Sequence, residues 1–274
     1  MSSDLHAAAL QVLQVCDPSE KCGRTRALFE ALRSGQLKPG ESAPAIELPE
    51  PGRPARPHLV SPRALPQRGL GTDEGRAAFL HAIAHIEFNA INLALDAVYR
   101  FRGMPDSFYM DWARVADDEA RHFQLLQQRL QALGFAYGDF DAHNGLWDMA
   151  CKTAHDCLIR MALVPRVLEA RGLDVTPGMI ARLHNLGDTA SVAVLEVILE
   201  EEVSHVAIGT HWYQWCCARA GLEPVSTFQH LLDTHAPDSV KPPFNSTARM
   251  AAGFSADEIA GLEQRAGRKA LSQA

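Results

Sequence analysis

The stretch VAVLEVILEEEVSHVAIGTHWYQWCC, residues 192–217, is apolar at both ends but carries three consecutive glutamates and a histidine in its middle. Apolar residues recur along it at intervals of three and four, which predicts an amphipathic helix from about 189 to 220. Glu202 falls on the apolar face, and His205 lies three positions further along that face. The two preceding glutamates lie on the flank and on the opposite side. The helix is therefore expected to carry one carboxylate and one imidazole into the core.

A second predicted helix follows Gly103-Met104-Pro105, ends near residue 133 and repeats this pattern. Its apolar face contains both Glu119 and His122. A buried ionised carboxylate without a partner is costly and tends to become neutral instead. Two Glu-x-x-His pairs on core faces therefore call for positive charge in the interior, and a metal ion would supply it.

Two further helical segments each place a single glutamate on a core face. Glu87 lies in a helix predicted over about 73–102, where neighbouring alanines leave space around it. Glu169 lies in a third helical region, which starts near residue 144 and, after one interruption, continues to Gly187. We expect this region to be interrupted by RGLDVTPG at 171–178, because glycine and proline disfavour a helix interior.

The spacing of the four glutamates predicts two antiparallel hairpins. Glu87 and Glu119 are 32 residues apart with a predicted turn at their midpoint, and Glu169 and Glu202 are 33 residues apart with another. Each hairpin then brings its ligands to one level, as in four-helix bundles that hold two metal ions between carboxylates. The sequence thus predicts an all-α fold, a four-helix bundle of two helical hairpins joined by a long crossover. The predicted metal ligands are Glu87, Glu119, His122, Glu169, Glu202 and His205.

The donor types favour two irons, with manganese as the alternative at one or both positions. Four carboxylates and two imidazoles suit these metals better than zinc. Cys216 and Cys217 lie too far along their helix from His205 to ligate. His81 and His85, four residues apart, could also bind metal, but capping a loop or packing against the N-terminal arm is the alternative for them.

The chain divides into three predicted parts. The first contains two short helices between residues 4 and 34, and then a stretch rich in Pro and Gly that reads as a linker or wrapping arm. The arginines of this arm could form a basic strip for a partner, or the arm could lie along the core. A last helix is opened by the capping box Ser255 to Glu258. The predicted parts are 1–71 (helices and arm), 72–222 (the bundle) and 223–274 (a helical extension packed on the bundle).

Composition bounds the partners and the compartment. A net charge of -7 and a pI near 5.9 disfavour nucleic acid and anionic membranes, which require a basic surface, except for a modified base taken as a substrate. Apolar stretches are interrupted by charge before they reach the roughly 20 residues of a membrane span. The six cysteines contain no C-x-x-C pair and read as reduced thiols. We expect a soluble cytoplasmic protein, monomeric or dimeric.

Several segments carry a resemblance to a known family. DEARH at 118–122 is similar to the Asp-Glu-x-Arg-His signature of ferritin-like, oxygen-activating di-iron enzymes. More narrowly, HIEFNAINLALDAVYRF, PRVLEARGLDVTP, ILEEEVSHVAIGTHW and KPPFN resemble a bacterial family of ferritin-like proteins known only as a domain of unknown function, over about 72–254. The resemblance implies the ferritin-like fold and the same six ligands. It supplies no substrate.

The second ligand motif departs from the first. It reads EEVSH, so that Glu201 and Ser204 stand where the first has Asp118 and Arg121. A ligating histidine commonly donates its other ring N–H to a carboxylate or carbonyl. Asp118 and Glu201 are therefore candidates for this role toward the histidine of the opposite hairpin, or else surface acids.

These observations favour an oxidoreductase, a di-iron oxidase or oxygenase that acts on a small molecule or a modified base with O₂ or peroxide. The predicted break after Glu169 would then serve as a channel mouth. Electrons would come from a separate reductase or from the substrate, since no rubredoxin-type cysteine pair is present. The alternatives are a metal-handling or peroxide-removing protein without an organic substrate, and a metal-binding bundle without turnover.

Overall fold

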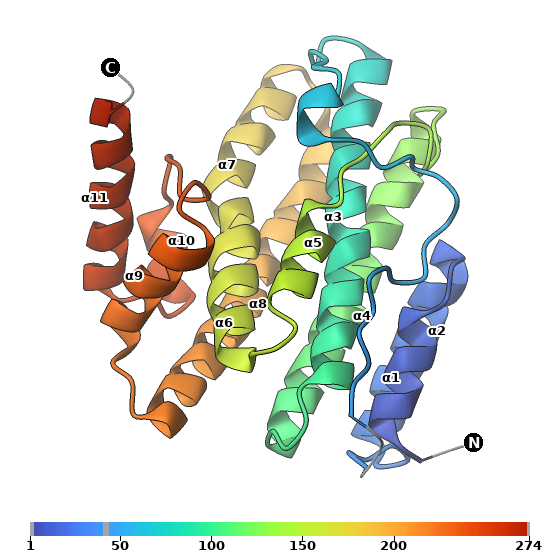
Figure 1. Ribbon diagram of the computed structural model, residues 1–274. Helices are drawn as coiled ribbons and strands as arrows, with labels where there is room; N and C mark the ends of the chain where they lie inside the picture. Colours follow the sequence, from blue (N-terminus) through green and yellow to red (C-terminus); the bar gives the residue numbers. More distant parts are fainter. Residues whose placement is uncertain (1–2, 41–43, 273–274) are drawn as a thin grey trace. The chain divides into compact units, whose positions relative to one another are not determined.

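The computed structural model describes residues 3–40 and 44–272, with side chains as far as residue 268. Within those ranges the chain forms helices and loops and no β-strand, as predicted for the fold class. The chain separates into two compact units, Met1–Lys152 and Thr153–Ala274, and each is built around one long helical hairpin (Figure 1). The three predicted parts, with their boundaries near 71 and 222, remain a prediction.

The hairpin of the first unit consists of two long helices joined at Gly103, whose φ of 69° provides the left-handed turn residue. The Thr72 side chain caps the first of them by accepting from the N–H of Gly75. Two N-terminal helices pack on this hairpin, as Figure 1 shows in blue. The helices of the unit are α1 (Leu5–Leu13), α2 (Pro18–Arg33), α3 (Asp73–Arg100), α4 (Asp106–Ala132) and α5 (Gly145–Lys152).

Helix α3 is the most deeply buried element of this unit. By length and composition it could cross a membrane, yet 72% of its most apolar window is buried within the protein. The same helix buries polar side chains, among them Glu87, Asn89, Asn92 and Asp96. A core helix of a bundle accounts for both features.

The arm after α2 is fastened to the helices by a buried lysine. Lys21 Nζ donates to the carbonyl oxygens of Leu13, at 3.0 Å, and Gly52, at 2.7 Å, and to the side-chain oxygen of Asn92. A Cβ at Gly52 would lie 2.2 Å from the carbonyl oxygen of Gln14, so only glycine fits this approach. One amine thus connects α1, α2, α3 and the arm, whose described residues include the 3₁₀ turn η1 (Pro62–Ala64).

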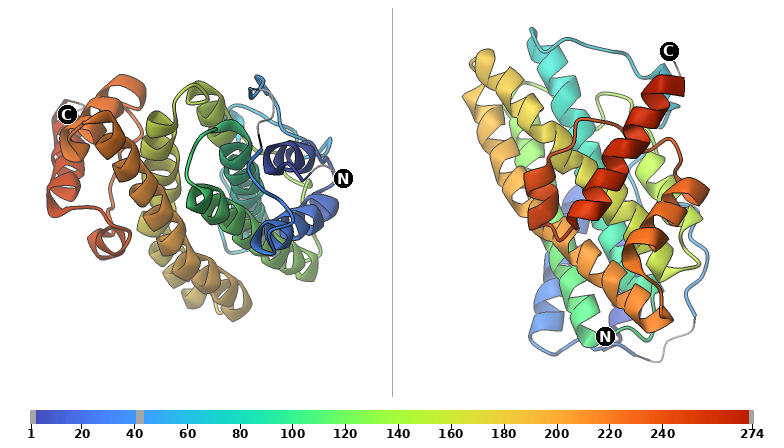
Figure 2. Two further views of the ribbon diagram at one scale, coloured as in Figure 1. Left: turned by 90° about the horizontal axis from the view of Figure 1, so that it is seen from below. Right: turned by 90° about the vertical axis from the view of Figure 1, so that its left-hand side faces the viewer.

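The hairpin of the second unit turns at Gly187, whose φ is 74°. Three C-terminal helices, orange and red in Figure 2, pack on the hairpin or on one another. The predicted capping box is present, because Ser255 and Glu258 exchange side-chain to backbone hydrogen bonds of 2.9 and 3.1 Å. The elements are α6 (Cys157–Leu163), the π-helix η2 (Val164–Glu169), α7 (Ala170–Asn185), α8 (Thr189–Ala220), α9 (Pro224–His235), α10 (Ser246–Ala251) and α11 (Ala256–Ser272).

The predicted interruption at 171–178 is wrong. Helix α7 runs without a break through RGLDVTPG, with Pro177 in its interior. A proline has no N–H and so leaves the carbonyl four residues earlier, that of Leu173, without its helical donor. Asn245, from the loop before α10, donates its Nδ2 hydrogen to that carbonyl at 3.2 Å. A side chain distant in sequence therefore replaces the missing hydrogen bond, and the helix continues.

The irregularity lies on the other side of Glu169, in the π-helix. The N–H of Ala170 donates to the carbonyl of Pro165, five residues earlier, so the chain is wound more widely here. The widened turn approaches α8 at Gly209, where a Cβ would lie 2.2 Å from Pro165 Cβ. Glycine at this position lets η2 and α8 pack closely, and Glu169 is the last residue of η2.

Candidate metal centre

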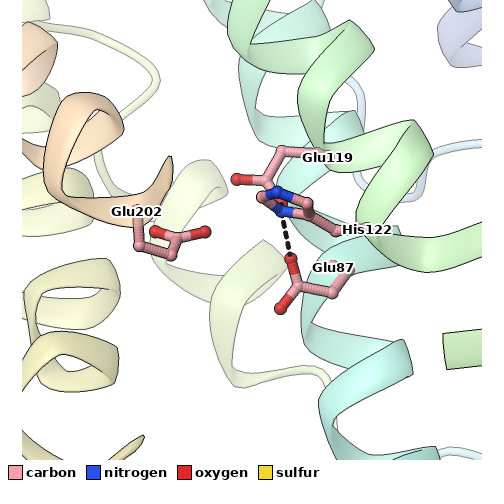
Figure 3. A group of neighbouring side chains, drawn as sticks. All are labelled: Glu87, Glu119, His122 and Glu202. Atoms are coloured by element: carbon pink, nitrogen blue, oxygen red, sulfur yellow. Dashed lines mark hydrogen bonds and ion pairs between the residues drawn. The ribbon is translucent and has the colours of Figure 1, made fainter. Parts of the chain in front are cut away.

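In the first unit three predicted ligands lie together in the interior. Glu87 projects from α3, and Glu119 and His122 project from α4 (Figure 3). Their exposed fractions are 4%, 0% and 0%. His122 Nδ1 lies 3.3 Å from a Glu87 oxygen and 3.5 Å from a Glu119 oxygen, and one ligand atom of each residue lies within 4.8 Å of the others. The hairpin register inferred from the spacing therefore does bring these three side chains together.

The cluster concentrates negative charge away from water. Burial, together with the neighbouring Glu119 carboxylate, raises the pKa of Glu87 to about 8. Burial alone would lower the pKa of His122, but its contacts with Glu119 and Glu87 outweigh this effect and raise it to about 11. Glu87 and His122 therefore both hold a proton near neutral pH. A divalent cation at this place would replace these protons, because it satisfies both carboxylates and the imidazole nitrogen at once.

The second unit carries the other predicted ligands. Glu202 and His205 lie on α8, with His205 fully buried and Glu202 9% exposed, and His205 Nδ1 is 3.5 Å from a Glu202 oxygen. Glu169 is half-buried at the end of η2, an element that packs against α8. Glu200, predicted to face away, is exposed. The Glu-x-x-His pair of α8 therefore has the inward orientation that its sequence pattern predicts.

The two candidate acids beside the ligands are less buried. Asp118 accepts a hydrogen bond from Arg121 at 3.0 Å, one helical turn further along α4. Glu201 is half-buried, and its carbonyl accepts from the Ser204 hydroxyl at 2.8 Å. Their role toward the histidine of the opposite hairpin remains a prediction.

His81 and His85 have a structural role in the first unit. His81 Nε2 accepts from the N–H of Gly138 at 2.9 Å, and its ring stacks on Tyr137. His85 Nδ1 lies 2.8 Å from the Tyr137 hydroxyl, and its Nε2 is 3.2 Å from the carbonyl oxygen of His143. Burial lowers the pKa of both histidines to about 4. Both histidines thus bind the loop after α4, in agreement with the alternative to metal ligation that the sequence offered, namely capping a loop.

Sequence reasoning missed a pair of buried arginines in the second unit. Arg166 is fully buried in η2, with an ion pair to Glu258 at 2.5 Å. Arg249 is 4% exposed and forms a two-point ion pair with Asp174. One signal was available, since Arg166 interrupts the apolar run MALVPRVL, but its partner lies 92 residues away in sequence.

Comparison with known proteins identifies relatives but no activity. Residues 14–260 match the family described as "Protein of unknown function (DUF455)". An "Uncharacterized protein" of Haemophilus influenzae (strain ATCC 51907 / DSM 11121 / KW20 / Rd) is 45% identical over 258 residues, which cover 90% of this chain and 89% of that protein. No solved structure matches the chain.

Proposed function

The chain belongs to the DUF455 family, and from its buried ligands we propose that it is a carboxylate-bridged di-iron protein, an O₂-dependent oxidase or oxygenase acting on a small molecule. The observation that carries this proposal is the cluster of Glu87, Glu119 and His122, whose side chains converge in the interior of a helical hairpin. The second hairpin carries the same Glu-x-x-His pattern at Glu202 and His205.

The donor set fits iron or manganese. Each hairpin offers carboxylate oxygens and one imidazole, and within the two ligand motifs no cysteine lies among the donors. Such oxygen-rich sets are typical of iron and manganese sites. The proposal joins the two sets into one ferritin-like centre, because six ligands in the order Glu, Glu-x-x-His, Glu, Glu-x-x-His make up the known four-helix carboxylate site for two metals.

The side chains would share the work as follows. The imidazoles of His122 and His205 and the carboxylates of Glu87, Glu119, Glu169 and Glu202 would hold the two metals. Bound ferrous iron would supply the two electrons that O₂ reduction requires. Burial of Glu87, Glu119 and His122 keeps water from these donors. A separate reductase or the substrate would restore the electrons.

The π-helix adds support for a reaction site. Such segments are often found at functional sites, because the wide turn displaces a side chain from its regular helical position. Glu169, the last residue of η2, is the proposed ligand in this segment. The segment RGLDVTPG, where the sequence predicted a channel mouth, is continuous helix. We therefore place the opening of the substrate path at η2 instead.

Metal content and oxygen consumption test the proposal. We expect about two irons per chain after anaerobic ferrous loading, measured by mass spectrometry, and metal-dependent O₂ uptake. Glu119→Gln and Glu202→Gln should abolish the uptake, because a neutral amide is a much weaker ligand for these cations than a carboxylate. Glu200→Gln, an exposed change on the same helix as Glu202, is the matched control and should leave uptake unchanged.

The negative results separate the alternatives. If the protein binds two metals but consumes no O₂, the oxidase or oxygenase proposal is wrong. The result would instead support peroxide removal, metal handling or metal binding without turnover. No bound metal, in a folded protein supplied with iron and manganese, would overturn the entire ligand assignment.

A further inference from the structure

Two cysteines from different helices of the second unit lie at the same level. Because the chain turns back at Gly187, α8 runs antiparallel to α6, η2 and α7, and it packs against all three (Figure 1). Pro165 of η2 meets α8 at Gly209, where a Cβ would lie 2.2 Å from Pro165 Cβ. Cys157 is eight residues before Pro165, and Cys216 is seven residues after Gly209. At about 1.5 Å per residue, these separations along the two helices are nearly equal.

The direction of the two side chains also brings them together. Seven residues are nearly two turns of an α-helix, so Cys216 lies on the same face of α8 as Gly209, the face that meets η2. Cys157 is the first residue of α6, which packs on α8. Each thiol is the hydrogen-bond partner of the other, and both cysteines are free. Cys157 and Cys216 therefore form a thiol pair that joins two helices.

The hydrogen bond makes the two thiols unequal. It lowers the pKa of Cys216 and, together with burial, raises the pKa of Cys157, so Cys216 becomes the thiolate more readily. Arg219 also favours the charged form of Cys216 and Arg160 that of Cys157, whereas Asp156 opposes both. Cys216 is 9% exposed and Cys157 is half-buried, so a small oxidant can reach the pair from solvent.

The other four cysteines are in different surroundings. Cys16 and Cys151 are exposed, and their thiols donate to backbone carbonyl oxygens at 3.8 Å. Cys22 and Cys217 are buried, and burial raises the pKa of both thiols, that of Cys22 to about 12. The thiol pair thus combines a neighbouring sulfur, a lowered pKa and access from solvent.

We propose that Cys157 and Cys216 form a reversible disulfide that fastens α6 to α8 when the protein meets hydrogen peroxide. The Cys216 thiolate attacks one peroxide oxygen and becomes a sulfenic acid, and the other oxygen leaves as water once it is protonated. The Cys157 sulfur then displaces the hydroxyl group, which leaves as a second water. The pair loses two electrons and two protons, and the peroxide takes up both. A dithiol reductant reverses the reaction by thiol–disulfide exchange.

The disulfide constrains the part of the second unit that contains η2. The two cysteines are 59 residues apart in sequence, and the loop that they close includes η2, α7 and the turn at Gly187. Closing a long loop lowers the entropy of the unfolded chain and so stabilises the folded state. The oxidised protein should therefore unfold at a higher temperature than the reduced protein. The proposal requires no metal and does not depend on the proposed oxidase activity.

Thiol counting on the full chain tests the pair directly. The reduced protein is treated with hydrogen peroxide in a buffer that contains a metal chelator, and is then denatured and alkylated with N-ethylmaleimide. Peptide mass spectrometry without a reductant locates the modified and the cross-linked cysteines. We expect the loss of two alkylated thiols per chain and one cross-link, between Cys157 and Cys216. Dithiothreitol should restore both thiols.

Serine variants provide the controls. Cys157→Ser and Cys216→Ser should each abolish the cross-link, whereas Cys151→Ser, an exposed change in the first unit, should leave it unchanged. Peroxide treatment should raise the midpoint of thermal unfolding by several degrees in the wild type and in Cys151→Ser, but not in Cys157→Ser. The proposal is overturned if Cys157 and Cys216 both remain alkylated after peroxide treatment, or if the cross-link joins other cysteines or two chains.

Discussion

The close contact between η2 and α8 makes Gly209→Ala an informative substitution. A Cβ at this position would lie 2.2 Å from Cβ and 2.3 Å from Cγ of Pro165. Ordinary contacts between carbon atoms are about 3.5–4.0 Å, so the two helices must separate by roughly 1 Å or more. Overpacking of this kind costs about 1–3 kcal/mol. Pro165 cannot turn away, because its ring is part of the backbone.

Helix propensity acts in the opposite direction and needs a control. Replacing glycine by alanine inside a helix gains about 1 kcal/mol. Gly172 lies in α7, and a Cβ there would meet no atom within 4 Å, so Gly172→Ala should show this gain alone. The free energy of unfolding of the two variants should therefore differ by about 1–3 kcal/mol, with Gly209→Ala the less stable.

Urea unfolding of the metal-free chain, followed by circular dichroism, measures this difference. Thermal unfolding should agree, with about 2–4 °C for each kcal/mol in a protein of this size. Because Glu169 ends η2, Gly209→Ala should also bind less iron than Gly172→Ala under the same loading. Equal stability of the two variants would refute the close packing of Pro165 against α8.

Three further predictions test separate features. Asn245→Ala should lower the free energy of unfolding in urea by about 1–2 kcal/mol, because it removes a helix cap and the donor to the Leu173 carbonyl. Adding Pro177→Ala to this variant should recover part of the loss. If the effects of the two substitutions simply add, Asn245 does not compensate for the proline. Lys21→Met should lower the free energy of unfolding by about 3 kcal/mol or more, since it leaves three buried oxygens without a donor. A change below about 1 kcal/mol would argue against a stabilising role for these three hydrogen bonds. Burial lowers the pKa of His81 from 6.5 to about 4, so the unfolded chain binds the proton more tightly and stability falls as pH drops through that range. In His81→Gln, the decrease in the free energy of unfolding between pH 6.5 and 4 should be smaller by up to about 3 kcal/mol. The same pH dependence in variant and wild type would show that His81 is not buried as a neutral ring.

Much of the candidate site was accessible from local patterns. The three- and four-residue spacing of apolar positions places Glu119, His122, Glu202 and His205 on inward faces, and the structure buries all four. Their orientation is predictable because the rotation per residue of an α-helix is nearly constant. Glu87 and Glu119 are equally far from Gly103 in the sequence, and this spacing likewise predicts that Glu87 on α3 faces Glu119 and His122 on α4.

What the sequence by itself determined, then, is the helical class, the two hairpins and the inward direction of Glu119, His122, Glu202 and His205, because these depend on period and turn residues within one segment. What only the tertiary structure decided depends on contacts between distant segments. RGLDVTPG reads as a break, and it stays helical because Asn245, 72 residues from Leu173, supplies the donor that Pro177 lacks. Arg166 is buried because Glu258, 92 residues away, provides its counter-charge. Such pairings follow from the packed fold, since no local pattern specifies which distant side chain will arrive.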